Sequence, residues 1–229
     1  MQFGSVFQRL LWKIFQAEQK KGPVFLMKGD IVDSFYRGCL RVQGLARTRL
    51  VVPLDNRDGK PLIPLPLADQ MGWAESSPFF TALSDTPADL GNAYIKVGVH
   101  PRPHSYDLVA DTNRNPSPVS TWRPMQLQRQ VPNNPPVEYI DVYPDNFIEL
   151  AQGSLHRRNR IRSLLFYALE QNFWRPDALY PDHQRDLIST KKLLKGDVAW
   201  ETIKIILGYL VDTITETIQL PAHRADLFH

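Results

Sequence analysis

The chain has 229 residues, of which 43% are hydrophobic and 22% charged, so its composition is that of a globular protein, not a disordered or fibrous one. Its 27 basic and 24 acidic residues leave a net charge of +3, which permits binding to nucleic acid without indicating it. One cysteine excludes an internal disulfide bond, and no apolar run approaches the ~20 residues of a membrane-spanning helix, so we expect an intracellular protein, cytoplasmic or nuclear.

The N-terminal region predicts a helix followed by a buried strand. Apolar residues recur at helical spacing over residues 4–20, and Gly22 with Pro23 ends this amphipathic helix. Residues 24–28 form a short apolar run, which is typical of a strand buried on both faces. This strand leads directly to Asp30, so a carboxylate is expected at its C-terminal end.

Two short strands and a long helix are predicted next. The strands are expected at residues 39–42 and 50–53, with a turn and a Pro-rich stretch after them. The helix should begin at Ser76 or the serine after it, because serine is a good N-cap, and run to residue 97. Pro87 falls inside this helix, where it should kink the helix or cost about 3 kcal/mol.

The second half of the chain predicts a loop, a hairpin, a helix and further strands. Residues 98–136 are rich in proline and show no sustained periodicity, so we expect a long loop. Residues 139–153 carry alternating apolar residues on both sides of a Pro-Asp-Asn turn, which is a hairpin signal. A helix is predicted over residues 154–174, and two β-rich segments over residues 200–209 and 212–220.

Two acidic stretches are the candidate chemical sites. Asp30 ends a predicted strand, and Asp145 with Asn146 lies at the tip of the predicted hairpin. Asp and Asn favour turns for backbone reasons alone, so the hairpin tip could be purely structural. A carboxylate held between two rigid strands can equally be aimed at a metal ion or a substrate. The histidines show no metal-ligand spacing and are expected at the surface: His100, His104, His156, His183, His223 and His229.

Three stretches, in this order, resemble motifs A, B and C of the reverse transcriptases of retroelements. They read LMKGDIVDSFY at 26–36, MGWAESSPFF at 71–80 and YIDVYPDNFIELAQG at 139–153. The family patterns are similar to KIDISDGFYR, PMGWTESPPFF and DVYVDDFIGLAQG. The later segments KKLLKGDVAW and ILGYLVDTITETIQLP also resemble those that follow motif C, including the Leu-Gly pair of the primer grip, so the resemblance extends from about residue 9 to residue 221.

The resemblance implies an α+β fold, namely a reverse-transcriptase-like palm in which helices back an antiparallel sheet. Residues 1–97 would form the partial fingers and the part of the palm with motifs A and B. Residues 98–136 would be the Pro-rich loop, and residues 137–229 the rest of the palm, with the motif C hairpin, a helix and the primer-grip-like strands. All three would belong to one domain, and nothing in the chain resembles a thumb or an RNase H domain.

The resemblance implies RNA-directed DNA polymerisation by two-metal nucleotidyl transfer, with a template–primer and a deoxynucleoside triphosphate as partners. Two Mg²⁺ ions would be held by Asp30 and Asp145, with Asn146 at the third catalytic position. Phe35 would pack beneath the sugar, although a core aromatic is an equally good interpretation of that residue alone. The backbone of Met71 and Gly72 would contact the incoming nucleotide.

Nucleic-acid contacts are implied for the primer-grip pair and for a basic run, namely Leu207, Gly208, Arg157, Arg158, Arg160 and Arg162, with Arg37, Arg41, Arg47 and Arg49 as a second set. A run of charges is more often a solvated helix face than a binding site, so both interpretations of the arginines stay open. If these side chains bind phosphates, the affinity should fall steeply with salt.

The chain departs from the family pattern at the hairpin tip. Asn146 stands where the family has a second adjacent acid, which removes one of three negative charges that would face the metals. Pro144 replaces a residue that keeps its backbone NH. The sequence therefore predicts a reverse-transcriptase palm whose polymerase activity is impaired or lost. The alternative is a catalytically inactive remnant that binds nucleic acid or serves as a scaffold.

Overall fold

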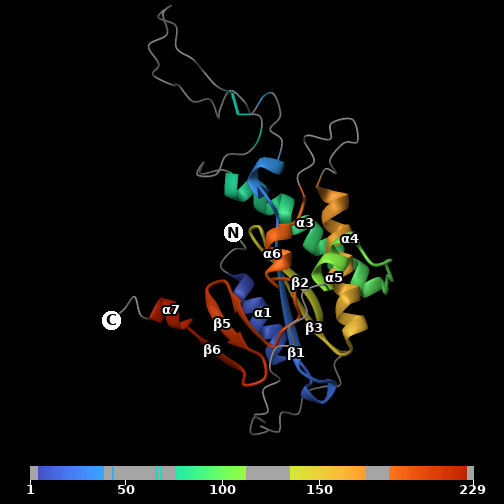
Figure 1. Ribbon diagram of the computed structural model, residues 1–229, viewed down its shortest axis with the longest axis vertical. Helices are drawn as coiled ribbons and strands as arrows, with labels where there is room; N and C mark the ends of the chain where they lie inside the picture. Colours follow the sequence, from blue (N-terminus) through green and yellow to red (C-terminus); the bar gives the residue numbers. More distant parts are fainter. Residues whose placement is uncertain are drawn as a thin grey trace, which may run out of the picture. The chain divides into compact units, whose positions relative to one another are not determined.

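The computed structural model of the chain describes residues 5–38, 43, 65–66, 68, 76–111, 135–173 and 186–225 (Figure 1). Two compact units are distinguished, one of Met1–Val32 with Ser84–His229 and one of Asp33–Leu83. The fold is α+β, with two small antiparallel sheets and helices, as expected at that level. None of the helices in the described ranges combines the length and apolarity that a membrane crossing requires.

The first sheet contains three antiparallel strands in the order β1-β3-β2. They are β1 (Val24–Asp30), β2 (Glu138–Tyr143) and β3 (Asn146–Gln152), so the predicted strand and hairpin are confirmed, each strand being slightly longer than expected. The central strand β3 is buried along nearly its whole length, because it has a strand on each side and packed layers on both faces. The register places Val24 opposite Gln152 and, at the other end, Asp30 opposite Asn146.

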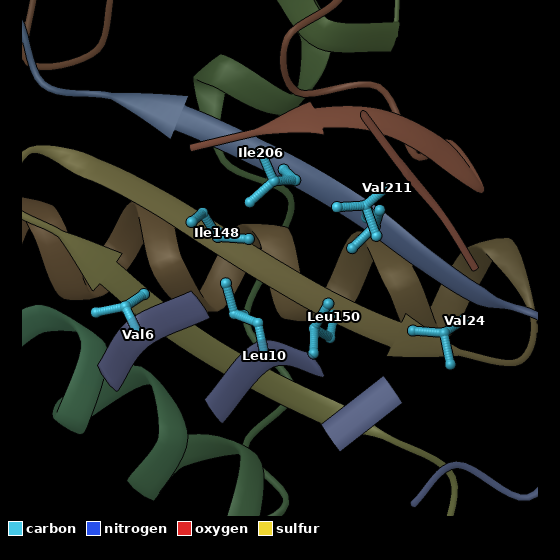
Figure 2. Packing of buried hydrophobic residues seen from close by; sticks show 8 residues of the cluster. Val6, Leu10, Val24, Ile148, Leu150, Ile206 and Val211 are labelled. Atoms are coloured by element: carbon cyan, nitrogen blue, oxygen red, sulfur yellow. The ribbon is translucent and has the colours of Figure 1, made fainter. Parts of the chain in front are cut away.

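One face of this sheet packs against α1 (Val6–Phe15) and the second sheet. Figure 2 shows the apolar cluster that joins them, with labelled side chains from several elements turned toward one another: Val6, Leu10, Val24, Ile148, Leu150, Ile206 and Val211. Leu26 belongs to the same cluster. The helix predicted over residues 4–20 is shorter than expected and ends at Phe15. A single 3-10 turn, Gln19–Lys21, follows it.

The second sheet contains β4 (Ile203–Ile206), β5 (Tyr209–Asp212) and β6 (Thr217–Gln219), all antiparallel. The sequence predicted two segments here, but the structure has three strands. Leu207 and Gly208 both have positive φ, 49° and 88°, which is the backbone of a tight two-residue hairpin turn and ends β4 after Ile206.

The opposite face of the first sheet is covered by α5 (Leu155–Asn172), which packs on β3. Another helix, α3 (Ser76–Val97), contains Pro87 as predicted. Asn92 of α3 binds the outer backbone of β2: its Nδ2 donates to the Ile140 carbonyl at 2.7 Å, and the Ile140 amide donates to its Oδ1 at 3.0 Å. The exposed edge of β2 is therefore satisfied by a side chain at that point.

The prediction of an uninterrupted loop over residues 98–136 is wrong for its first part, where α4 (Ser105–Asp111) forms. The helix is stabilised by Asp107, whose Oδ2 accepts from the His104 backbone NH at 2.7 Å. The same carboxylate accepts from Arg162 Nε and Ser163 Oγ of α5, both at 2.6 Å. These contacts come from a distant segment, so local proline content could not reveal them.

His104 is buried, which corrects the expectation that all the histidines lie at the surface. Its Nε2 lies 3.0 Å from Glu170 Oε1 of α5, and its ring packs edge-on against Tyr167. Two short helices complete the described elements, α6 (Thr190–Leu194) and α7 (Ala222–Ala225). The strands predicted at 39–42 and 50–53 lie outside the described residues.

Candidate functional site

The two acidic stretches meet at one end of the first sheet. Asp30 is the last residue of β1 and lies opposite Asn146, the first residue of β3. The Ile31 amide donates to the Asp145 carbonyl at 3.3 Å, so the hairpin tip is attached to the end of β1. Asp30 is only 6% exposed. Antiparallel pairing therefore brings together three residues from segments that are far apart in sequence.

The surroundings of Asp145 disfavour the ionised form of its carboxyl group. Burial raises the pKa of Asp145, and the negative charge of Asp30 raises it further. A hydrogen bond from Asn146 Nδ2 to Asp145 Oδ1, 2.9 Å long, acts in the opposite direction because it favours the ionised form. Asn146 thus presents its amide NH₂, a hydrogen-bond donor, to the neighbouring acid.

Lys192 is a member of this site that the sequence did not predict. Its Nζ donates to Asp30 Oδ2 in an ion pair. The side chain comes from α6, whose N-cap residue, Ser189, donates its backbone NH to the Asp30 carbonyl at 3.3 Å. The sequence showed only that KKLLKGDVAW is similar to a segment that follows motif C. It gave no signal that a lysine of this segment contacts Asp30.

The donor set does not fit a pair of Mg²⁺ ions. Mg²⁺ requires several hard oxygen ligands in octahedral geometry. Here Asp30 is bound by an ammonium group, and Asn146 turns its NH₂ toward Asp145. Within the described part of the chain, no three His, Cys, Asp or Glu side chains are grouped so that they could hold a metal ion. Asp30 and Asp145 are thus the carboxylates that could hold a single cation, and only after rearrangement.

A cavity of about 500 Å³ lies next to Asn146, between the hairpin tip and the second sheet, although neither Asp30 nor Asp145 lines it. Asn146 and the Leu207–Gly208 turn both line it, so the predicted primer-grip pair and the hairpin tip share one space. Its remaining walls include two cations and two tyrosines: Lys28, Arg224, Tyr143 and Tyr209. The Tyr209 ring stacks on Phe7 of α1, with the ring centroids 5.2 Å apart.

Gly208 suits this turn because of its backbone conformation. Its φ of 88° is unfavourable for any residue with a side chain. The end of the exposed Arg224 side chain lies against this glycine, at the wall of the cavity.

The arginines at the start of α5 have partners within the chain. Arg157 and Arg160 both pair with Glu138, the latter at 2.9 Å, and the Arg158 guanidinium lies 3.6 Å from the centroid of the Phe25 ring. Burial lowers the pKa of Arg158. Nucleic-acid binding by these three residues stays a prediction. For Arg162 it is corrected, because this side chain is 2% exposed and its Nε donates to Asp107.

The remaining predicted residues belong to the second unit or to undescribed segments. Phe35 lies in the short 3-10 helix Ser34–Arg37 and packs against Phe80, with centroids 4.7 Å apart, as a core aromatic would. Its role beneath a sugar stays a prediction. Met71 and Gly72 lie outside the described residues, as do Arg41, Arg47 and Arg49.

The site thus combines the buried Asp30, the half-buried Asp145, a lysine bound to Asp30, and a neighbouring cavity with aromatic and cationic walls. All of these residues belong to the larger of the two compact units. Comparison of the chain with protein-family models and with curated proteins gives no match.

Proposed function

We propose that this chain is a palm of the reverse-transcriptase type that binds nucleic acid, and in which RNA-directed DNA polymerisation is impaired or lost. The observation that carries the proposal is the pairing of Asp30 with Asn146 beside Asp145, next to a cavity that Leu207 and Gly208 also line. The motif order in the sequence gives these residues the roles of catalytic acids and primer grip. Their proximity supports that assignment, because such roles require one common site.

The walls of the cavity support binding of a polynucleotide. Arg224 and Lys28 supply positive charge, which attracts phosphates, although the Lys28 ammonium also lies 3.6 Å from Asp197 Oδ2. Tyr143 and Tyr209 are each partly exposed, at 37% and 42%, and bases of any sequence stack on such rings. Cations and rings along one groove are the combination that binds single strands and strand ends without sequence preference.

The acid pair explains why polymerisation would be impaired. Two-metal transfer depends on carboxylates that stabilise both cations while charge develops on the phosphate. Asn146 contributes no charge, and Lys192 already neutralises Asp30. The net charge of the group is therefore too small to concentrate two divalent cations.

Binding is tested by fluorescence anisotropy with a labelled primer–template. The affinity should fall steeply between ~50 and ~200 mM salt, because each phosphate contact releases counterions. Lys28→Gln and Arg224→Gln should each weaken binding about three- to tenfold and reduce the salt slope by about one. Lys96→Gln is the matched control, since this exposed lysine near the end of α3 does not line the cavity. A salt-independent affinity, or equal losses in all three variants, would favour a scaffold that does not bind nucleic acid at this cavity.

Polymerisation is tested by primer extension on an RNA template with Mg²⁺. The wild-type chain should extend the primer weakly or not at all. The double substitution Asn146→Asp with Pro144→Val restores the adjacent acids and the backbone NH of the family pattern, and should increase extension at least about tenfold. Asp145→Ala should abolish any extension that is seen. Efficient extension by wild type that survives Asp145→Ala would eliminate this site as the catalytic centre.

A further inference from the structure

We propose that Lys192 is a built-in counter-ion of Asp30, so that the acid pair is satisfied from within the chain and binds no divalent cation in the resting fold. The inference rests on the proposed function in one respect, the expectation that a polymerase palm would bind a cation at these acids. The contacts from which it is argued lie within the chain and do not depend on nucleic-acid binding.

The backbone fixes the lysine beside the acid. The segment before α6 runs along the end of β1: the Val32 amide donates to the Leu187 carbonyl at 3.0 Å, and the Ser189 amide donates to the Asp30 carbonyl at 3.3 Å. Ile31 and Ile188 form an isolated antiparallel bridge between the same segments. The start of α6 is therefore attached to the backbone at the end of β1.

The start of α6 then directs the side chain. Ser189 is the N-cap, and its Oγ accepts from the Lys192 backbone NH at 3.3 Å. This bond places Lys192 in the first turn of the helix, one turn away from the residue that is bonded to Asp30. The backbone hydrogen bonds of this segment therefore position the Lys192 ammonium beside the Asp30 carboxylate.

The Asp30 carboxylate needs the ion pair with Lys192 because it is buried. The Asp30 side chain is 6% exposed and has lost most of its hydration, whereas the Lys192 side chain is 49% exposed. A buried carboxylate needs a partner, either a metal ion or a charged side chain. Because Lys192 already supplies that charge, an incoming divalent cation must displace the ammonium before it can reach Asp30.

The second acid is also engaged by the chain. Asp145 Oδ1 accepts from Asn146 Nδ2, and a cation at that oxygen would face an NH₂ group. With both acids ionised and Lys192 protonated, the three groups carry a net charge of −1. A single divalent cation would meet little attraction there, and two would repel each other without compensation.

The test measures Mn²⁺ binding in the absence of nucleic acid, by electron paramagnetic resonance of the free ion. Lys192→Gln should lower the dissociation constant for Mn²⁺ at least about tenfold, because it removes one positive charge from contact with the acids. Lys192→Arg should behave like wild type. Lys191→Gln is the matched control, as it removes the adjacent exposed lysine of the same helix. Adding Asp30→Asn to Lys192→Gln should cancel the gain.

Equal Mn²⁺ affinities in wild type and Lys192→Gln would overturn the proposal, as would a gain that survives Asp30→Asn. A second measurement needs no substitution. Paramagnetic broadening of the Ile31 and Val32 amides by millimolar Mn²⁺ should be absent in the wild-type chain, and its presence would show a cation at the acids. Because nucleic acid is left out, a failure of this test is separate from a failure of the binding test above.

Discussion

Replacing Glu149 by methionine should raise the free energy of unfolding at pH 7 by about 1–3 kcal/mol, which is the usual cost of burying an unsatisfied polar group. Glu149 lies in the middle of β3, opposite Met27 and Ile140, and is 0% exposed. Neither of its carboxylate oxygens has a hydrogen-bond partner within the described ranges. Methionine has a similar volume and can occupy the same space without a polar group.

The stability of the wild-type chain should also depend on pH through this residue. Burial raises the pKa of Glu149 well above its ordinary value; the positive charge of Arg162 lowers it, and Asp107 raises it. Above about pH 4.3 the unfolded chain releases this proton, while the folded chain retains it. The folded state then binds more protons, so stability falls as pH rises from that value to the folded-state pKa.

Urea unfolding at several pH values between about 4 and 8 separates these effects. Glu149→Gln has no titrating group at this position, so its stability relative to wild type should increase with pH over that range. Ile148→Val, in the same strand, neither adds nor removes a titratable group, so it is the control and its stability difference from wild type should be the same at each pH. A constant difference between wild type and Glu149→Gln at every pH would contradict a buried, protonated glutamic acid.

Glu149 marks the limit of what the sequence revealed about the first sheet. Residues 139–153 predicted the hairpin correctly, because its turn residues and apolar runs are local signals. The face of β3 could not be predicted, since a central strand is buried on both sides and loses its period-2 pattern. One signal was present: the reverse-transcriptase pattern that residues 139–153 resemble has a glycine where this chain has Glu149.

The contacts missed at the site and behind the sheet share another cause. Lys192 reaches Asp30, and Arg162 reaches Asp107, across long separations in sequence. The basic run at the start of α5 looked like a phosphate-binding face because its acidic partners lie elsewhere, in β2 and in the segment expected to be a loop. Composition reports the charge of a segment, whereas pairing depends on the fold.

Asp107→Ala should destabilise the larger unit severely, by about 3–5 kcal/mol. Asp107 is 4% exposed and binds the guanidinium of Arg162, so its removal takes a charged partner away from a buried cation. Ser163→Ala is the matched control. It removes one hydroxyl bond to the same carboxylate, keeps both charges, and should cost only about 1 kcal/mol. Similar losses for the two variants, measured by urea unfolding, would show that the charge pair contributes little.

The cost of Asp107→Ala should itself depend on Glu149. Arg162 interacts electrostatically with both acids, so in the single variant Glu149 can ionise and take over part of the role of Asp107. In the Glu149→Met background that second acid is gone, and Asp107→Ala should cost about 0.5–3 kcal/mol more than it does alone. A double-mutant cycle measured by urea unfolding at pH 7 gives this coupling directly. If the effects of Asp107→Ala and Glu149→Met are strictly additive, Glu149 does not compensate for the loss of Asp107. The electrostatic interaction between Arg162 and Glu149 would then contribute nothing measurable to stability.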